Sequence, residues 1–121
     1  MRKTLITLFF ISIFAAGCAT HEPLYYWGNY SNSLYKYKKT PTPENQAAHK
    51  VVLVKIIEES NKANKRVPPG VCCEYGYILL KEGKTQEALQ YFDLEEKAYP
   101  ESKPFLDRLR SRLLEKKEDK P

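Results

Sequence analysis

Two stretches of helical periodicity joined by a tight turn constrain the fold of this chain more than any other feature. Apolar side chains recur at three- and four-residue spacing in residues 71–81 and again in residues 85–99, which predicts two helices with one apolar face each. The turn between them contains Gly83, Thr85 is the expected N-cap of the second helix, and Pro100 stops that helix. The pattern therefore predicts a helical hairpin that ends at Pro100.

Residues 69–102 resemble one tetratricopeptide (TPR) repeat, a helix–turn–helix unit of about 34 residues. The resemblance implies a mechanical role for each matching residue. Small residues let the two helices approach closely, an aromatic ring fills the groove between them, a glycine forms the turn and a proline ends the second helix. The residues at these positions are Gly76, Ala88, Phe92, Gly83 and Pro100. The sequence departs from the repeat at Cys72, Leu79 and Glu95, where Trp, Tyr and Ala are usual.

A single hairpin of this kind cannot bury its own apolar faces, so other helices must cover it. A long helix is expected over residues 43–64, with Thr42 as its N-cap and Pro43 at its first position. Together with the segment WGNYSNSLYKY (27–37) it makes a diverged second repeat, and a helix over residues 102–116 caps the far side. The side chains expected to face inward on this last helix are Phe105, Leu106, Leu109 and Leu113. The predicted fold is all-α, with TPR-like hairpins and about four to five helices.

The segment 25–37 is rich in aromatic residues, more so than the core of a small domain needs. They are Tyr25, Tyr26, Trp27, Tyr30, Tyr35 and Tyr37. Tyr and Trp make strong interface anchors because they are large, rigid and able to form hydrogen bonds. We expect some of them to bind a partner; the alternative, that Trp27 and Tyr30 share a buried helical face with Leu34, is equally compatible with the spacing.

The N-terminus carries a targeting signal. Arg2 and Lys3 precede an apolar run of about ten residues, and the small residues 15–17 lead directly to Cys18. This order is typical of a secretory signal, and the run is too short to span a bilayer. The segment resembles a bacterial lipobox, which implies cleavage before Cys18 and attachment of fatty acyl chains such as palmitate to that cysteine. Ala19 follows the cysteine, where Asp would favour retention in the inner membrane, and its resemblance to the Gram-negative sorting pattern implies sorting to the outer membrane.

From the lipobox to about residue 110 the chain resembles a family of short proteobacterial lipoproteins with a domain of unknown function. The segments that carry the resemblance are YYWGNYSNSLYKY (25–37), PPGV (68–71) and EYGYILLKEGKTQEALQYFDLEEKAYPES (74–102). The resemblance implies association with a lipoprotein similar to the curli secretion channel, and so a part in an outer-membrane assembly. The predicted organisation is a signal peptide (1–17), an acylated cysteine with a tether (18–24), a TPR-like helical domain (25–116) and a polar tail (117–121).

The net charge of +5 does not indicate nucleic-acid binding, because basic and acidic residues alternate along the chain as on a solvated helical surface. One basic cluster stands out near the C-terminus and contains Arg108, Arg110, Arg112, Lys116 and Lys117. Cations are favoured at the C-terminal end of a helix, which is the simpler interpretation. Contact with anionic lipid or cell-wall polymer is the alternative.

No motif for a metal site or for nucleophilic catalysis occurs in the sequence. His21 and His49 have no ligand-type side chains at the spacing of a metal site, and the pairs 58–59 and 95–96, all Glu, are expected on solvated helix faces. We therefore expect no enzymatic activity and no cofactor except the covalent lipid on Cys18. Cys72 and Cys73 are expected to be small buried residues, because no neighbouring Cys-x-x-Cys motif activates them.

The sequence thus favours a lipid-anchored outer-membrane protein that faces the periplasm and acts as a TPR-like scaffold for another envelope protein. One alternative is a lipoprotein that regulates a cell-wall synthase. A second, less favoured alternative is a thiol-redox protein that uses Cys72 and Cys73.

Overall fold

The computed structural model describes Met1 and residues 21–118, and within them it is all-α, as the sequence predicts, without a strand. The elements are α2 (Tyr30–Lys39), α3 (Pro43–Lys62), α4 (Val71–Lys81), α5 (Thr85–Ala98), the short 3-10 helix η1 (Pro100–Ser102) and α6 (Lys103–Glu118). The predicted lipidation site Cys18 and residues 2–17 of the predicted signal peptide lie outside the described residues, as do residues 119–121 of the predicted tail. None of the described helices is long and apolar enough to cross a membrane.

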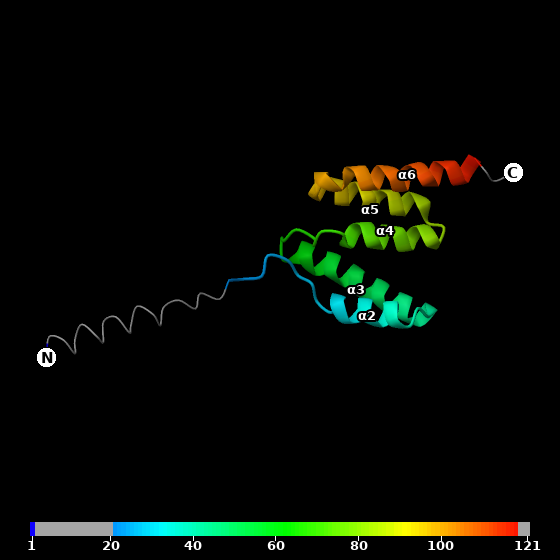
Figure 1. Cartoon of the computed structure of the whole chain (residues 1–121). Helices are drawn as coiled ribbons and strands as arrows, with labels where there is room; N and C mark the ends of the chain where they lie inside the picture. Colours follow the sequence, from blue (N-terminus) through cyan, green and yellow to red (C-terminus); the bar gives the residue numbers. More distant parts are fainter. Residues whose placement is uncertain (2–20, 119–121) are drawn as a thin grey trace.

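The helices form a row in which each one lies beside the next and runs back along it (Figure 1). α2 lies at one end of this row and α6 at the other. The core lies where α3, α4 and α5 pack together, and Leu106 of α6 is buried as well. The buried apolar side chains of the three central helices include Leu53, Ile56, Val71, Tyr75, Ile78, Leu79, Ala88 and Phe92.

The start of α3 is determined locally by two residues. Thr42 Oγ1 accepts a hydrogen bond from Asn45 N at 3.2 Å, which satisfies one of the free donors at the helix start. Pro43 occupies the first turn, where its missing N–H leaves no donor unpaired. Just after the helix, Asn64 adopts the left-handed conformation with φ 52°, which is common after a helix end. The hydrogen bond to Thr42 confirms the predicted N-cap of α3.

α4 and α5 approach closely because Gly76 has no side chain. A Cβ atom at this position would lie 2.8 Å from Phe92 Cε1 and 3.0 Å from Ala88 O. Both Ala88 and Phe92 are completely buried. The turn between the two helices places Gly83 at φ 80°, a left-handed conformation that glycine adopts without steric strain. At the other end of α5, Pro100 is the first residue of η1.

Two predictions about the last two helices are wrong. Thr85 does not cap α5: the helical hydrogen bonds begin one residue earlier, with Ala88 N donating to Lys84 O at 3.0 Å, and Lys84 is the N-cap. Phe105 does not face inward. Leu106 of α6 is buried, with 0% exposure. The neighbouring Phe105 lies on another face of the helix and is 56% exposed.

Residues 21–29 are not helical, and α2 begins only at Tyr30. Trp27 O accepts a hydrogen bond from Tyr30 N at 3.1 Å, so Trp27 lies in the turn before α2 and not on a helical face shared with Tyr30. Further upstream, Pro23 O accepts a hydrogen bond from Lys65 Nζ at 3.1 Å. The described part of the predicted tether is therefore held beside the loop that follows α3.

Candidate functional site

An apolar hollow of about 760 Å³ lies between α4 and α6. Two large apolar side chains stand exposed at its rim, Tyr77 of α4 (46% exposed) and Phe105 of α6 (56% exposed). It is also lined by Pro69, Cys73, Glu74, Glu95, Leu109 and Arg112. Large exposed apolar side chains that gather at a hollow are typical of a binding surface. We call this hollow the α4–α6 groove.

A second hollow, of about 830 Å³, follows the outer side of α3. The apolar side chains that line it are small, namely Ala47, Val51 and Val54. At its edge Lys50 Nζ and Glu82 Oε2 form an ion pair at 2.7 Å. Because no aromatic side chain lines it, it offers weaker anchoring than the α4–α6 groove.

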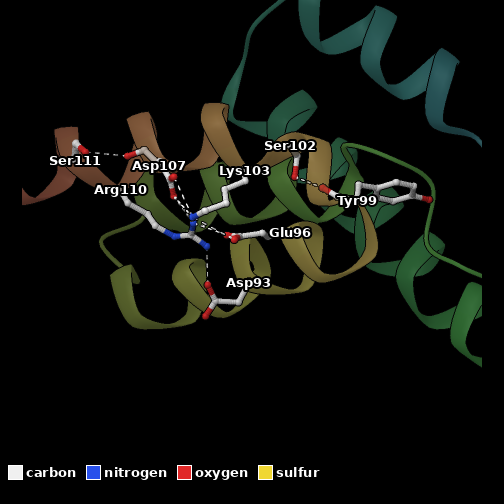
Figure 2. A network of polar contacts seen from close by, with 8 residues as sticks. All are labelled: Asp93, Glu96, Tyr99, Ser102, Lys103, Asp107, Arg110 and Ser111. Atoms are coloured by element: carbon white, nitrogen blue, oxygen red, sulfur yellow. Dashed lines mark hydrogen bonds and ion pairs between the residues drawn. The ribbon is translucent and has the colours of Figure 1, made fainter.

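Polar contacts join α6 to α5 (Figure 2). Arg110 Nη1 donates to Glu96 Oε2 at 2.7 Å, and Arg110 Nη2 donates to Asp93 Oδ1 at 2.6 Å. Lys103 Nζ lies 3.4 Å from Glu96 Oε1. The hydrogen bond from Arg110 holds the pKa of Glu96 below its usual value. Several charges acting together position a helix more effectively than an isolated surface pair.

The arginines of the basic cluster predicted near the C-terminus differ in their contacts. Arg110 is bound to carboxylates of α5, whereas Arg108 and Arg112 are exposed. Among the side chains that the structure describes, neither Arg108 nor Arg112 has an ion-pair or hydrogen-bond partner. Arg112 lines the α4–α6 groove, and Arg108 lies one helical turn after Phe105.

Glu95 forms a buried polar part of the groove wall. The sequence predicts a solvated side chain here, and that prediction is wrong, because Glu95 is 4% exposed. Its Oε1 accepts a hydrogen bond from Gly70 N at 2.7 Å, and its Oε2 accepts one from Cys73 N at 3.4 Å. Gly70 is the N-cap of α4 and has no side chain, so Glu95 supplies the acceptor that a capping residue normally provides. The departure from the TPR pattern at Glu95 was the one sequence signal of this role.

Glu74 joins the groove to a polar cluster shared by α2, α3 and α4. The central residue is His49, which is 0% exposed. Its Nδ1 lies 2.7 Å from Ser33 Oγ, and its Nε2 lies 3.0 Å from Glu74 Oε1. Tyr30 OH donates to Glu74 Oε2 at 2.8 Å. Burial and this hydrogen bond raise the pKa of Tyr30 to about 12, because both disfavour the phenolate.

A serine, a histidine and a carboxylate in line also occur in hydrolases, but this cluster lacks the other features of such a site. Ser33 is 7% exposed, and its hydroxyl donates to Tyr30 O at 2.9 Å. The backbone N–H of Ser33 is bonded to Asn29 O, as in any helix interior, so it is not available to stabilise an oxyanion. We interpret the cluster as the contact that docks α2 on α3 and α4. Sequence reasoning missed it because the partners of His49 come from two other helices.

The comparisons with known proteins identify the family. The model of the family described as "Domain of unknown function (DUF4810)" matches residues 24–109, most of the chain and nearly all of the helical row. The chain belongs to this family. The predicted membership of a family with a domain of unknown function is therefore confirmed, whereas acylation, the TPR-like repeat and the association with a curli-channel-like lipoprotein stay predictions. Comparison with curated proteins and with solved structures found no match.

Within the DUF4810 domain, the aromatic residues predicted to bind a partner lie around α2 and do not line the α4–α6 groove. Trp27 and Tyr35 are exposed, while Tyr25, Tyr26, Tyr30 and Tyr37 are half-buried. The rings of Tyr30 and Tyr37 pack against His49, with centroid distances of 5.6 Å and 6.0 Å. These two rings therefore belong to the contact between α2 and α3, which leaves Trp27 and Tyr35 as the exposed members of the block.

The two adjacent cysteines of the DUF4810 domain are free thiols. Burial raises the pKa of Cys72 to about 12 and that of Cys73 to about 11, and the nearby Glu95 carboxylate acts in the same direction. A raised pKa leaves little thiolate, the reactive form, at neutral pH. Among the described residues, no group of His, Cys, Asp and Glu side chains is arranged to hold a metal ion.

Proposed function

We propose that the DUF4810 domain is a scaffold module on the periplasmic side of the outer membrane, where it binds another envelope protein through the α4–α6 groove. The observation that carries this proposal is the pair of exposed side chains Tyr77 and Phe105 at one apolar hollow. Exposed aromatic rings beside a hollow provide the large, rigid contact area that anchors protein interfaces.

The form of the helical row supports a TPR-like interpretation of the proposal. Successive helices are antiparallel neighbours, and Gly76 permits the close contact of α4 with α5. Stacked hairpins of this type form an extended concave surface that binds a partner. We assign the α4–α6 groove, which lies between the first helix of the hairpin and the helix that follows it, to this surface.

The proposed membrane location rests on Cys18. Two or three acyl chains on one cysteine hold a protein firmly at a bilayer, since each buried methylene contributes about 0.8 kcal/mol. The first described residues, including Pro23, already contact the domain at Lys65. The chain between Cys18 and the domain is therefore short, which supports a partner at the same membrane surface. The resemblance to lipoproteins that accompany a curli-channel-like protein makes such a channel our first candidate partner.

A binding role is favoured over the redox alternative by the state of the thiols. The raised pKa values of Cys72 and Cys73 disfavour the thiolate that exchange with a disulfide requires. The buried Ser33–His49–Glu74 cluster likewise offers no accessible nucleophile. Both observations favour a binding role over nucleophilic chemistry at these two places.

Site-specific photo-crosslinking of the full-length chain in its own membranes tests the proposal. Benzoylphenylalanine replaces Phe105 in one variant and Leu94 in a control variant, because Leu94 is exposed to a similar extent (50%) on α5 and does not line the groove. We expect an adduct with a second envelope protein from the Phe105 variant only. If the two variants give the same background, the groove is not a binding site.

The anchor has its own test. A full-length Cys18→Ser chain should leave the membrane fraction and appear with soluble periplasmic proteins. If this variant remains in the membrane fraction after a high-salt wash, acylation of Cys18 is not what holds the protein there.

A further inference from the structure

We propose that the α4–α6 groove binds an acidic segment of its partner, in which an aromatic or branched aliphatic side chain is flanked by carboxylates. This inference rests on the proposed function, because the groove must be an interaction site for it to hold. It adds the chemistry of the segment that the groove recognises.

The apolar part of the segment follows from the shape and lining of the groove. Tyr77 and Phe105 stand on opposite walls, one on α4 and one on α6, and Leu109 lies one turn further along α6. A hollow of about 760 Å³ between two apolar walls accommodates an inserted side chain, whose burial removes apolar surface from water on both sides.

The acidic part follows from which charges of the groove are already satisfied. Glu74 accepts one hydrogen bond from Tyr30 and shares another with His49, and both oxygens of Glu95 accept hydrogen bonds from backbone N–H groups at the N-terminus of α4. These carboxylates are engaged inside the domain, and Glu95 is almost completely buried.

Two arginine side chains at or beside the same groove, in contrast, form no ion pair with a described carboxylate. Arg112 lines the groove, Arg108 lies one turn before it on α6, and both are exposed. The carboxylates of Asp93 and Glu96 are bound to Arg110 on the α5 side of the helix. Arg112 in the groove and Arg108 beside it thus carry positive charges that have no ion-pair partner among the described side chains, and Arg binds carboxylates with two parallel hydrogen bonds.

Head-to-tail stacking of a second copy of this chain does not fit this charge pattern. The opposite end of the helical row is α2, which has no acidic residue and carries Lys36, Lys38 and Lys39 in its last turn. Head-to-tail stacking would bring this basic end against Arg108 and Arg112, and like charges would oppose the contact. A different, acidic protein fits both the hollow and the charges.

A lipid surface is also anionic, but it matches the groove less well. Binding in the plane of a bilayer requires apolar side chains on one outward face, with basic residues beside them. Here Tyr77 and Phe105 belong to two helices that flank a hollow, an arrangement suited to enclosing a side chain of a folded or extended protein segment. The groove therefore fits a protein segment better than a lipid surface.

Binding of two short peptides to the full-length acylated chain in neutral detergent micelles tests this inference. Both peptides contain Phe and Leu; in the first they are flanked by Asp and Glu, and in its twin by Lys. Fluorescence anisotropy should show saturable binding of the acidic peptide only. The double variant R108E/R112E should weaken binding by about tenfold or more, the effect expected when a charge-assisted contact is lost.

Two matched variants separate local from overall charge. K38E/K39E makes the same change in net charge at the α2 end and should leave binding unchanged. R108K/R112K should bind with an affinity between those of the parent chain and R108E/R112E, because Lys keeps the charge but cannot form two parallel hydrogen bonds. The proposal is overturned if the acidic peptide does not bind, if both peptides bind equally, or if K38E/K39E weakens binding as much as R108E/R112E. The proposal is also overturned if R108E/R112E binds the acidic peptide as well as the parent chain does but no longer sediments with phosphatidylglycerol vesicles. The occupant of the groove is then lipid.

Photo-crosslinking at Phe105 distinguishes failure of this inference from failure of the proposed function. If R108E/R112E gives the same adduct at the same yield as the parent chain, the groove binds a partner but acidic residues of that partner do not contribute to binding. If neither chain gives an adduct, the groove is not an interaction site and both proposals fail. We expect the adduct from the parent chain and a strongly reduced yield from R108E/R112E.

Discussion

The carboxylate of Glu95 on α5 accepts a hydrogen bond from the backbone N–H of Gly70 at the start of α4, with a donor–acceptor distance of 2.7 Å. This contact closes the α4–α5 hairpin at the end opposite the Gly83 turn. The carboxylate also lies at the positive end of the α4 helix dipole, which stabilises a negative charge there. A residue from the second helix therefore caps the first, and the wall of the α4–α6 groove depends on it.

Replacement of Glu95 should destabilise the domain although no apolar contact is removed. We expect E95A to lower the free energy of unfolding by about 2 kcal/mol, because it leaves donors at the start of α4 without their acceptor. E95Q should cost less, because its amide oxygen still accepts one hydrogen bond. Urea unfolding of the full chain, followed by circular dichroism, measures both, and the exposed Glu101→Ala serves as control. Equal midpoints for E95A and E101A would contradict the capping role.

The close contact at Gly76 predicts an inverted response to a helix-stabilising substitution. Glycine to alanine normally favours a helix by about 1 kcal/mol. Here the added Cβ would lie 2.8 Å from Phe92 Cε1 and 3.0 Å from Ala88 O, and the backbone atom cannot move aside cheaply. We expect G76A to lower the free energy of unfolding by about 2 kcal/mol through overpacking.

The double variant G76A/F92L provides the control for this contact. The smaller, flexible side chain makes room for the new Cβ, so the combined loss should be less than the sum of the two single losses. Additive losses in a double-mutant cycle would show that Gly76 and Phe92 do not constrain each other.

The parts of the fold that the sequence predicted correctly are those encoded by neighbouring residues. Thr42 and Pro43 lie next to each other and are sufficient to start α3, and Gly83 lies between two periodic stretches that it joins. Pro100 likewise ends a helix through its own geometry. Such signals need no knowledge of the rest of the structure.

The features that escaped prediction depend on residues from different helices. His49 is bound to Ser33 and Glu74, which are 16 and 25 residues away in sequence, so no spacing rule connects them. The position of Phe105 could not be read from α6 alone, because α6 carries apolar residues on adjacent faces. In the fold, α6 packs on α5 with Leu106 buried and with Arg110 paired to carboxylates of α5. The α4–α6 groove was missed for this reason.

The polar cluster predicts selective loosening of α2. α2 packs on α3, and His49 bonds to Ser33 of α2 while Glu74 accepts from Tyr30 of the same helix. H49A should remove the hydrogen bonds of His49 to Ser33 and Glu74 and leave the α4–α5 contact at Gly76 unchanged. Hydrogen exchange measured by mass spectrometry should then become faster in residues 30–39 while residues 71–98 keep their protection. The control Tyr35→Ala, which removes an exposed ring from α2, should change neither region. Uniformly faster exchange across all helices would refute a local docking role.

The reactivity of the thiols of Cys72 and Cys73 tests the redox alternative directly. Burial raises the pKa of Cys73 to about 11, so at pH 8 its thiolate fraction should be about a hundredfold lower than that of an unfolded cysteine with a pKa near 9. Alkylation by iodoacetamide, followed by peptide mapping, should therefore be slow at Cys72 and Cys73 in the folded chain and fast in urea. Because the folded pKa lies above the unfolded value, the stabilisation from the protonated thiol is complete below about pH 9 and is lost as the pH rises through about 11. C73A should accordingly show a smaller loss of unfolding free energy over this interval than the parent chain. Equal alkylation rates in the folded and unfolded chains would mean that the thiols are reactive in the folded domain. The thiol-redox function would then be as well supported as the scaffold function.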